Sequence, residues 1–304
     1  MSTLCARALR ILRTSNPADK VSETLALGSD WRSGVISEIG SAIPLDFPPR
    51  DSSVQIVPPT KTPKLGNAGN LRSRITILHS LANVEQFAID TALDNIIRFG
   101  NTSNPIANDP NTFGTDSSEF VNRMPKQFYD DFVRMATEEA GHFNMLQTRL
   151  KDFGSYFGAL PVHTGVWDSA MATADALLPR MAIVHMVHEA RGLDVNPGMI
   201  AKFRSNGNDE ESAKLLELIL EEEIGHVRIG LSWFSYLCNV QDIDKASKFA
   251  EIVEERFNGK LKPPFNEIAR EAAGFEKEMY MPLASTDVTP PASPKKTKKQ
   301  ALVA

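Results

Sequence analysis

Apolar residues return with the period of an α-helix along most of the chain, which predicts an all-α protein. In four long stretches an apolar side chain recurs every three or four residues, so that each stretch forms a helix with one apolar stripe. These helices are expected over residues 71–99, 125–153, 169–193 and 209–237, and the third is expected to be interrupted or kinked at Pro179. Four such stripes bury one another in a four-helix bundle.

Shorter amphipathic patterns extend the bundle at both ends of the chain. One helix is expected over residues 3–14 and a second from Pro17 to about residue 33, because Asn16 is a capping residue and Pro17 takes the first helical position. Two more are expected over residues 242–258 and from the turn at Pro263 to residue 278. We therefore divide the chain into residues 1–70, which pack on the bundle, residues 71–240, which form it, and residues 241–284, which complete the same domain.

Three segments lack a helical pattern. Residues 43–70 contain six prolines and predict an extended arm that lies across the helices. Residues 100–122 are rich in Asn, Ser, Pro and Asp, which predicts a long exposed loop. Residues 285–304 have no pattern that forms a core and predict a disordered tail.

Charge and composition narrow the classes of function. The formal net charge is −5, and the four lysines and one aspartate of the tail leave the rest of the chain at −8, which disfavours a nucleic-acid partner. The two cysteines exclude a disulfide framework and a four-thiolate metal site, and no apolar run reaches the length of about 20 residues that a membrane span needs. We expect a cytoplasmic protein. Arg7, Arg10 and Arg13 keep a mitochondrial presequence open, and the lysines of the tail keep a nuclear signal open.

One five-residue pattern, E-E-x-G-H, occurs twice. The copies are Glu138-Glu139-Ala140-Gly141-His142 in the second long helix and Glu222-Glu223-Ile224-Gly225-His226 in the fourth. In each copy the second glutamate and the histidine are three residues apart, so they lie on one side of the helix, one turn apart, and reach a single metal ion. A single copy is weak evidence, since polar pairs at this spacing also occur on solvated faces, but two matched copies indicate a metal centre.

The other two long helices each offer one glutamate in an apolar setting. Glu85 and Glu189 are these residues; near Glu85 the only other acids, Asp90 and Asp94, point well away from it on a helical wheel. Dinuclear iron and manganese carboxylate bundles combine two such E-x-x-H pairs with one glutamate from each remaining helix. Four carboxylates and two neutral imidazoles balance two divalent cations, and this donor set suits Fe or Mn. The predicted ligands are Glu85, Glu139, His142, Glu189, Glu223 and His226.

Several neighbours of these ligands have open roles. Glu138 and Glu222 are expected beside the ligands or on the surface rather than as ligands. His185, one turn before Glu189, is expected either beside the metal pocket or as a hydrogen-bonded core histidine. Glycine inside a helix costs about 0.8–1.0 kcal/mol relative to alanine, so the glycine before each histidine is expected to make room for a neighbouring helix or for the metals.

These blocks also resemble a known family. EEAGH, EARGLDV, EEEIGH and KPPFN follow one another as in the ferritin-like family catalogued as domain of unknown function 455, and the resemblance spans about residues 9–280. The resemblance implies a ferritin-like fold and places the family's ligands on the same six residues. It implies no substrate. Broader relatives include tRNA hydroxylases, di-iron oxygenases, manganese catalases and ferritins.

Four functions compete for such a chain. The main hypothesis is an oxidoreductase with two iron ions that activates O₂ to hydroxylate or oxidise an unknown small molecule, with electrons from a donor protein. A ferroxidase or iron-storage protein, a manganese catalase-like protein and a metal-free structural bundle are the alternatives. The helices added to the bundle disfavour a storage cage, so we expect a monomer or small oligomer.

Overall fold

The computed structural model describes residues 3–100, 124–257 and 259–285. These residues form helices joined by turns and loops, and they contain no strand beyond two isolated bridges, Ile56 with Val162 and Leu261 with Ala284. The predicted all-α class is confirmed. The loop predicted over 100–122, apart from Gly100, and the tail predicted from residue 285, apart from Ser285, lie outside the described residues.

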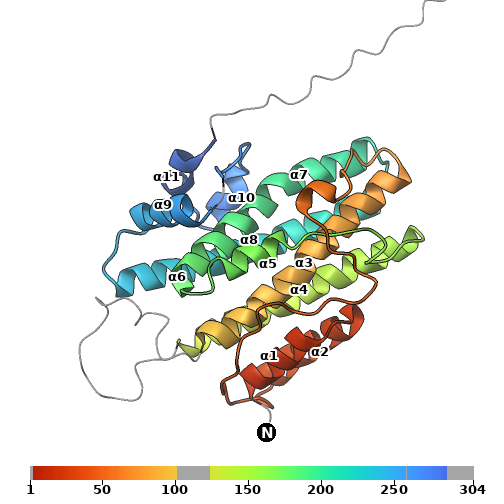
Figure 1. Cartoon of the computed structure of the whole chain (residues 1–304). Coiled ribbons are helices and arrows are strands. Elements are labelled where there is room, and N and C mark those ends of the chain that lie inside the picture. The colour runs from red at the N-terminus through yellow and green to blue at the C-terminus, as the bar shows by residue number, and fades with distance from the viewer. Residues whose placement is uncertain (1–2, 101–123, 258, 286–304) are drawn as a thin grey trace, which may run out of the picture.

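Four long helical segments form the bundle (Figure 1). α3 (Leu71–Phe99) packs along α4 (Lys126–Asp152), and α7 (Glu189–Ser205) packs along α8 (Glu210–Val240). α4 and α8 also contact each other, so the two pairs close into one bundle. Asn70 and Asp209 cap α3 and α8 by accepting hydrogen bonds from the backbone N–H groups of Ser73 and Ser212. The predicted bounds of α3, α4 and α8 are confirmed to within a few residues.

The third long helix differs from its prediction. α5 (Gly165–Met171) is a separate short helix, and α6 (Leu177–Arg180), the π-helix η2 (Met181–His188) and α7 then follow without a break. The interruption predicted near Pro179 is found at residues 172–176. Pro179 itself lies in the first turn of the helix that follows, where a backbone N–H has no helical acceptor anyway. The end predicted at residue 193 is wrong, since the helix continues to Ser205.

Asn266 explains how α7 continues through Pro197. A proline ring removes the N–H that would bond to the carbonyl four residues earlier, here that of Leu193. Asn266 Nδ2 donates to this carbonyl at 3.1 Å, and Asn266 also caps α10 (Glu267–Ala272). The segment after Pro264 therefore completes a helix that precedes it by about 70 residues.

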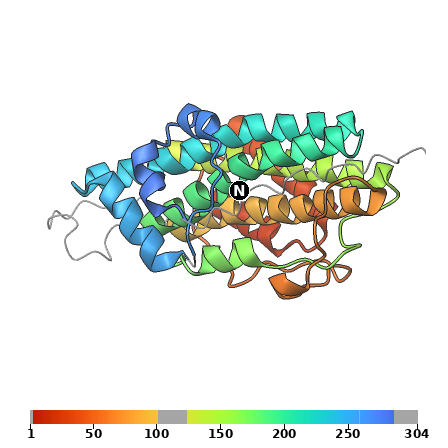
Figure 2. The same cartoon turned by 90° about the horizontal axis from the view of Figure 1, so that it is seen from above.

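Shorter elements cover the bundle. α1 (Leu4–Arg13) and α2 (Pro17–Arg32) pack on α3 and α4, whereas α9 (Lys245–Arg256), α10 and α11 (Lys277–Tyr280) gather at one end of the molecule (Figures 1 and 2). The proline-rich arm is extended apart from the short helix η1 (Pro59–Lys61), and it is tied to the bundle where Trp167 Nε1 donates to the carbonyl of Asp46. None of the described helices is long and apolar enough to cross a membrane.

A buried ion triad fastens α2 and the arm to α3. Asp90 lies between Lys20 of α2 and Arg50 of the arm; its carboxylate pairs with both, and the contact with Arg50 Nη1 is 2.6 Å. The side chains of Lys20 and Asp90 are fully buried. One helical turn later, Asp94 pairs with Arg98 and the buried Arg180 at 2.9 and 2.8 Å. Each of the two buried aspartates is therefore neutralised by lysine or arginine side chains of the protein.

Candidate metal centre

The six predicted ligands meet between the four long helical segments. They form two groups, and within each group the ligand atoms lie within 4.8 Å of one another. Glu139 and Glu223 belong to both groups, so their carboxylates lie between two neighbouring positions. The groups are Glu85, Glu139, His142 and Glu223, and Glu139, Glu189, Glu223 and His226.

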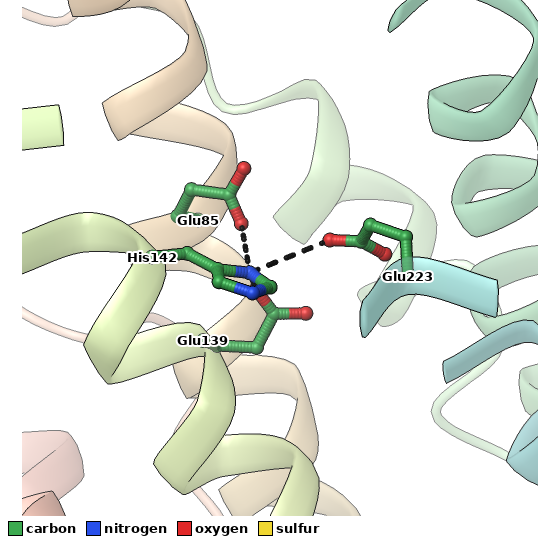
Figure 3. A group of neighbouring side chains, drawn as sticks. All are labelled: Glu85, Glu139, His142 and Glu223. Carbon is green, nitrogen blue, oxygen red and sulfur yellow. Dashed lines mark hydrogen bonds and ion pairs between the residues drawn. The ribbon is translucent and has the colours of Figure 1, made fainter. Parts of the chain in front are cut away.

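Both histidines turn the same ring nitrogen toward the carboxylates. His142 Nδ1 lies 3.2 Å from a Glu139 oxygen and 3.5 and 3.6 Å from oxygens of Glu85 and Glu223 (Figure 3). His226 Nδ1 lies 2.9 Å from the other Glu139 oxygen and 3.3 Å from the other Glu223 oxygen. The two oxygens of Glu139 thus face different histidines, and so do those of Glu223.

The outer ring nitrogens are held by the remaining glutamates of the motif. Glu222 lies 2.7 Å from His142 Nε2, and Glu138 lies 2.9 Å from His226 Nε2. Each copy of E-E-x-G-H therefore contributes its first glutamate to the histidine of the other copy. A carboxylate at Nε2 holds the ring proton there, which leaves the Nδ1 lone pair free for a metal.

Burial and mutual repulsion set the protonation of the cluster without metal. Burial, with the nearby charge of Glu139, raises the pKa of Glu85 well above its usual range, and burial with the charge of Glu223 does the same for Glu189. Burial would also raise the pKa of Glu139, but the imidazoles of His226 and His142 outweigh it and hold that pKa well below its usual range. Protons therefore take the place of cations in this pocket.

In the metal-free cluster positive charge resides on the two histidines, whose pKa values the surrounding glutamates raise despite burial. Among the described residues no lysine or arginine pairs with any of its four glutamates, and three of its buried atoms form no well-directed hydrogen bond: Glu139 Oε1, Glu223 Oε2 and His226 Nδ1. Burying an unpaired charged group costs roughly several kcal/mol. Two divalent cations would neutralise the buried carboxylates and remove this cost. The donor set and these inward-facing atoms fit a dinuclear metal centre.

Gly230, rather than the glycines of the two E-E-x-G-H motifs, allows two helices to approach closely beside the candidate centre. A Cβ at Gly141 or Gly225 would meet nothing within 4 Å, so the close helix approach predicted for these glycines is wrong, while the need for space beside the metals stays a prediction. A Cβ at Gly230 would lie 2.4 Å from the carbonyl oxygen of His185. Gly230 therefore lets α8 approach the π-helix η2, which ends at His188. The sequence already places Gly230 inside a predicted helix, where glycine is unfavourable, and this could have indicated a close helix contact.

His185 combines the two roles left open for it. Asn95 Oδ1 accepts from Arg180 at 2.9 Å, so the Asn95 amide nitrogen, 2.6 Å from His185 Nε2, is the donor and the ring proton is on Nδ1. That nitrogen lies 3.8 Å from Glu189, and burial lowers the pKa of His185 to about 3, so the ring is neutral. Asn95 and Arg180 hold His185 in its place beside Glu189, and neither residue was predicted.

A cavity of about 230 Å³, here called the inner cavity, ends on the carboxylate side of the cluster. Glu85, Glu139, Glu189 and Glu223 line it, and both histidines of the cluster are absent from its lining. Its rim includes Val84, which is 38% exposed. The apolar walls come mainly from α3, α7 and α8: Leu81, Val84, Ala88, Val166, Val195, Met199, Leu216 and Ile219. An apolar path therefore reaches the carboxylates from the side away from the histidines.

Comparison with known proteins gives a family. A family profile described as "Protein of unknown function (DUF455)" matches residues 13–281, a range that includes all six candidate ligands. An uncharacterized protein of Haemophilus influenzae is 32% identical over 273 residues, which are 87% of this chain and 88% of the relative. No solved structure matches the chain significantly. The chain belongs to the family described as protein of unknown function DUF455.

Proposed function

We propose that the protein is a ferritin-like dinuclear carboxylate protein that binds iron and activates O₂ to oxidise an organic substrate. Two helices that each bear E-E-x-G-H face two helices that each bear one glutamate, which is the arrangement of such bundles. Carboxylate and imidazole donors without thiolates suit iron, with manganese as the alternative.

The inner cavity is the observation that favours an enzyme over iron storage. Iron entry needs a polar route for a hydrated cation, whereas this cavity has walls of valine, leucine, isoleucine and methionine and a volume of about 230 Å³. Mostly apolar pockets with few polar groups are typical of sites for organic molecules. The carboxylates at its end place a bound molecule next to the candidate centre.

The residues of the chain would prepare the site in three ways. Glu222 and Glu138 hold the outer protons of the ligand histidines, and His185 lies beside Glu189 and limits its orientations. The apolar walls exclude water from the carboxylate side. Bound iron would supply the electrons that reduce O₂.

The decisive experiment is an anaerobic Fe(II) titration followed by exposure to O₂. We expect about two Fe(II) bound per chain and about two oxidised, after which the reaction stops until a reductant is added. Continued oxidation of many irons by a shell-sized particle would indicate storage. Vigorous O₂ release from peroxide by the manganese form would indicate a catalase, and a folded protein without affinity for Fe(II) or Mn(II) would contradict the metal centre altogether.

A further inference from the structure

A second cavity adjoins the inner cavity, and we call it the outer cavity. Its volume is also about 230 Å³, and it lies between α7 on one side and Phe257 with residues 259–265 on the other. His188 and Arg191 line both cavities, so the two meet along one side of α7. Arg191 follows the candidate ligand Glu189 by two residues, which is about 3 Å along the helix axis.

The outer cavity is strongly basic. Its lining carries Arg191, Lys260, Lys262 and Arg270, and its single acid is Asp194. Arg270 already neutralises Asp194, because its Nε and Nη2 donate to the two carboxylate oxygens at 2.9 and 2.7 Å. The lining therefore has a net charge of +3, whereas the whole chain has a net charge of −5.

These cations are available to a ligand. Arg191, Lys260 and Lys262 form no ion pair within the described part of the chain. Arg191 Nη1 donates a hydrogen bond to the carbonyl of Lys262 at 2.8 Å. Arg270 is 2% exposed, and its Nη1 has no hydrogen-bond partner among the described residues. A concave site lined by unpaired cations attracts an anion, and guanidinium groups suit the oxygens of a carboxylate or phosphate.

The two cavities differ in their chemistry and are neighbours that share His188 and Arg191 in their linings. The outer one offers positive charge, and the inner one offers apolar walls that end on four carboxylates. A neutral apolar molecule would leave the cations unused. An anion without an apolar part would leave the inner cavity unfilled and would not approach the buried carboxylates.

We propose that the substrate is an anionic amphiphile, with a carboxylate or phosphate head in the outer cavity and an aliphatic part in the inner cavity. Carbon atoms beyond the head group would then lie against Glu85, Glu139, Glu189 and Glu223. The identity of the bound molecule as a substrate rests on the proposed function, but its binding by the two cavities does not.

The test measures binding of four ten-carbon probes below their micelle concentrations. Decanoate, decyl phosphate, decanol and decyltrimethylammonium are titrated calorimetrically into the full-length protein, both metal-free and loaded with Mn(II). We expect Kd values for the two anions at least about tenfold below that of decanol, and no binding of the cation. The preference between decanoate and decyl phosphate identifies the head group.

Variants locate the probe. Arg191→Gln and Lys260→Gln should each raise the Kd of the anions by about tenfold while leaving that of decanol unchanged, because each removes one charged contact. Met199→Trp should weaken the binding of decanoate, decyl phosphate and decanol alike, because the larger side chain fills the inner cavity. Lys202→Gln, at an exposed position of α7 outside both cavities, is the matched control and should change nothing.

Two results would overturn this inference: equal affinity for decanol and decanoate, or anion binding that neither Arg191→Gln nor Lys260→Gln weakens. Circular dichroism and metal content are recorded for every variant, so a folding defect is separated from a binding defect. A protein that binds no metal but still prefers the anions contradicts the proposed function alone. A protein that binds metal without preferring the anions contradicts this inference alone.

Discussion

Two buried acids on α3 differ in the positively charged side chains around them. Asp90 is fully buried and lies between the cations of Lys20 and Arg50. Glu85, five residues earlier and also buried, faces other carboxylates and pairs with no lysine or arginine among the described residues. A buried charge that has its own cations joins parts of the fold, whereas a group of buried acids without them marks a place for cations from solution.

The largest contrast is expected for metal content. Glu223→Ala should reduce bound Fe(II) from about two per chain to less than one, because Glu223 contributes to both ligand groups. Glu221→Ala, on the exposed side of the same helix, is the matched control and should retain both ions. The measurement is iron analysis after anaerobic loading. Equal loss from both variants would show that this glutamate has no special role.

Replacing an acid by its amide should have different effects on the free energy of unfolding at the two buried acids of α3. In the metal-free protein, Asp90→Asn should lower the free energy of unfolding by about 3–5 kcal/mol, because Lys20 and Arg50 lose their buried partner. Glu85→Gln should leave it unchanged or raise it, since burial already raises the pKa of Glu85 and favours its neutral form. Urea denaturation measures both. Similar losses at the two positions would remove the distinction drawn here.

A smaller effect on metal affinity is expected from the two glutamates that contact the outer nitrogens of His142 and His226. Glu222→Gln should raise the Kd for Fe(II) by about 10–100-fold without abolishing binding, because it weakens the hold on His142 Nε2. Glu138→Gln should behave alike at His226, while Glu221→Gln should have no effect. Competitive titration with a chelator gives these constants. Wild-type affinity in both Glu222→Gln and Glu138→Gln would show that these contacts do not tune the ligands.

The smallest effect concerns a histidine away from the cluster. Burial lowers the pKa of His79 from 6.5 to about 4, and its Nε2 accepts hydrogen bonds from the backbone N–H groups of Gly158 and Leu160. The unfolded state therefore binds the proton more tightly, and stability is lost as pH falls from about 6.5 toward 4, by at most about 3 kcal/mol. The stability of His79→Gln should depend less steeply on pH in this window. Identical pH profiles would contradict this role.

Helix geometry made much of this molecule predictable from its sequence. The bounds of α3, α4 and α8 follow from unbroken apolar stripes, and the spacing of Glu139 and His142 fixes their common direction on any helix. The direction of Asp90 away from Glu85 was predictable too. Its burial was not, since it depends on how α2 and the arm fold over that face.

The remaining features depend on contacts between distant residues. At Pro197 in α7, Asn266 bonds to the carbonyl that the proline leaves without a donor, and the packing of α8 against the π-helix needs the absent Cβ of Gly230. Glu138 of α4 contacts His226 of α8, and Glu222 of α8 contacts His142 of α4; both contacts depend on the register of α4 against α8. Periodicity along one helix carries no information on such registers.

Two metal ions are expected to balance the negative charge of the glutamate cluster. Crystals of the full-length protein, grown with Fe(II) without oxygen and measured at the iron absorption edge, would show whether they bind there. We expect two anomalous peaks per chain between Glu139 and Glu223, one beside His142 Nδ1 and the other beside His226 Nδ1. A map without peaks in this cluster, from crystals whose protein is folded and fully loaded by analysis, would contradict this expectation.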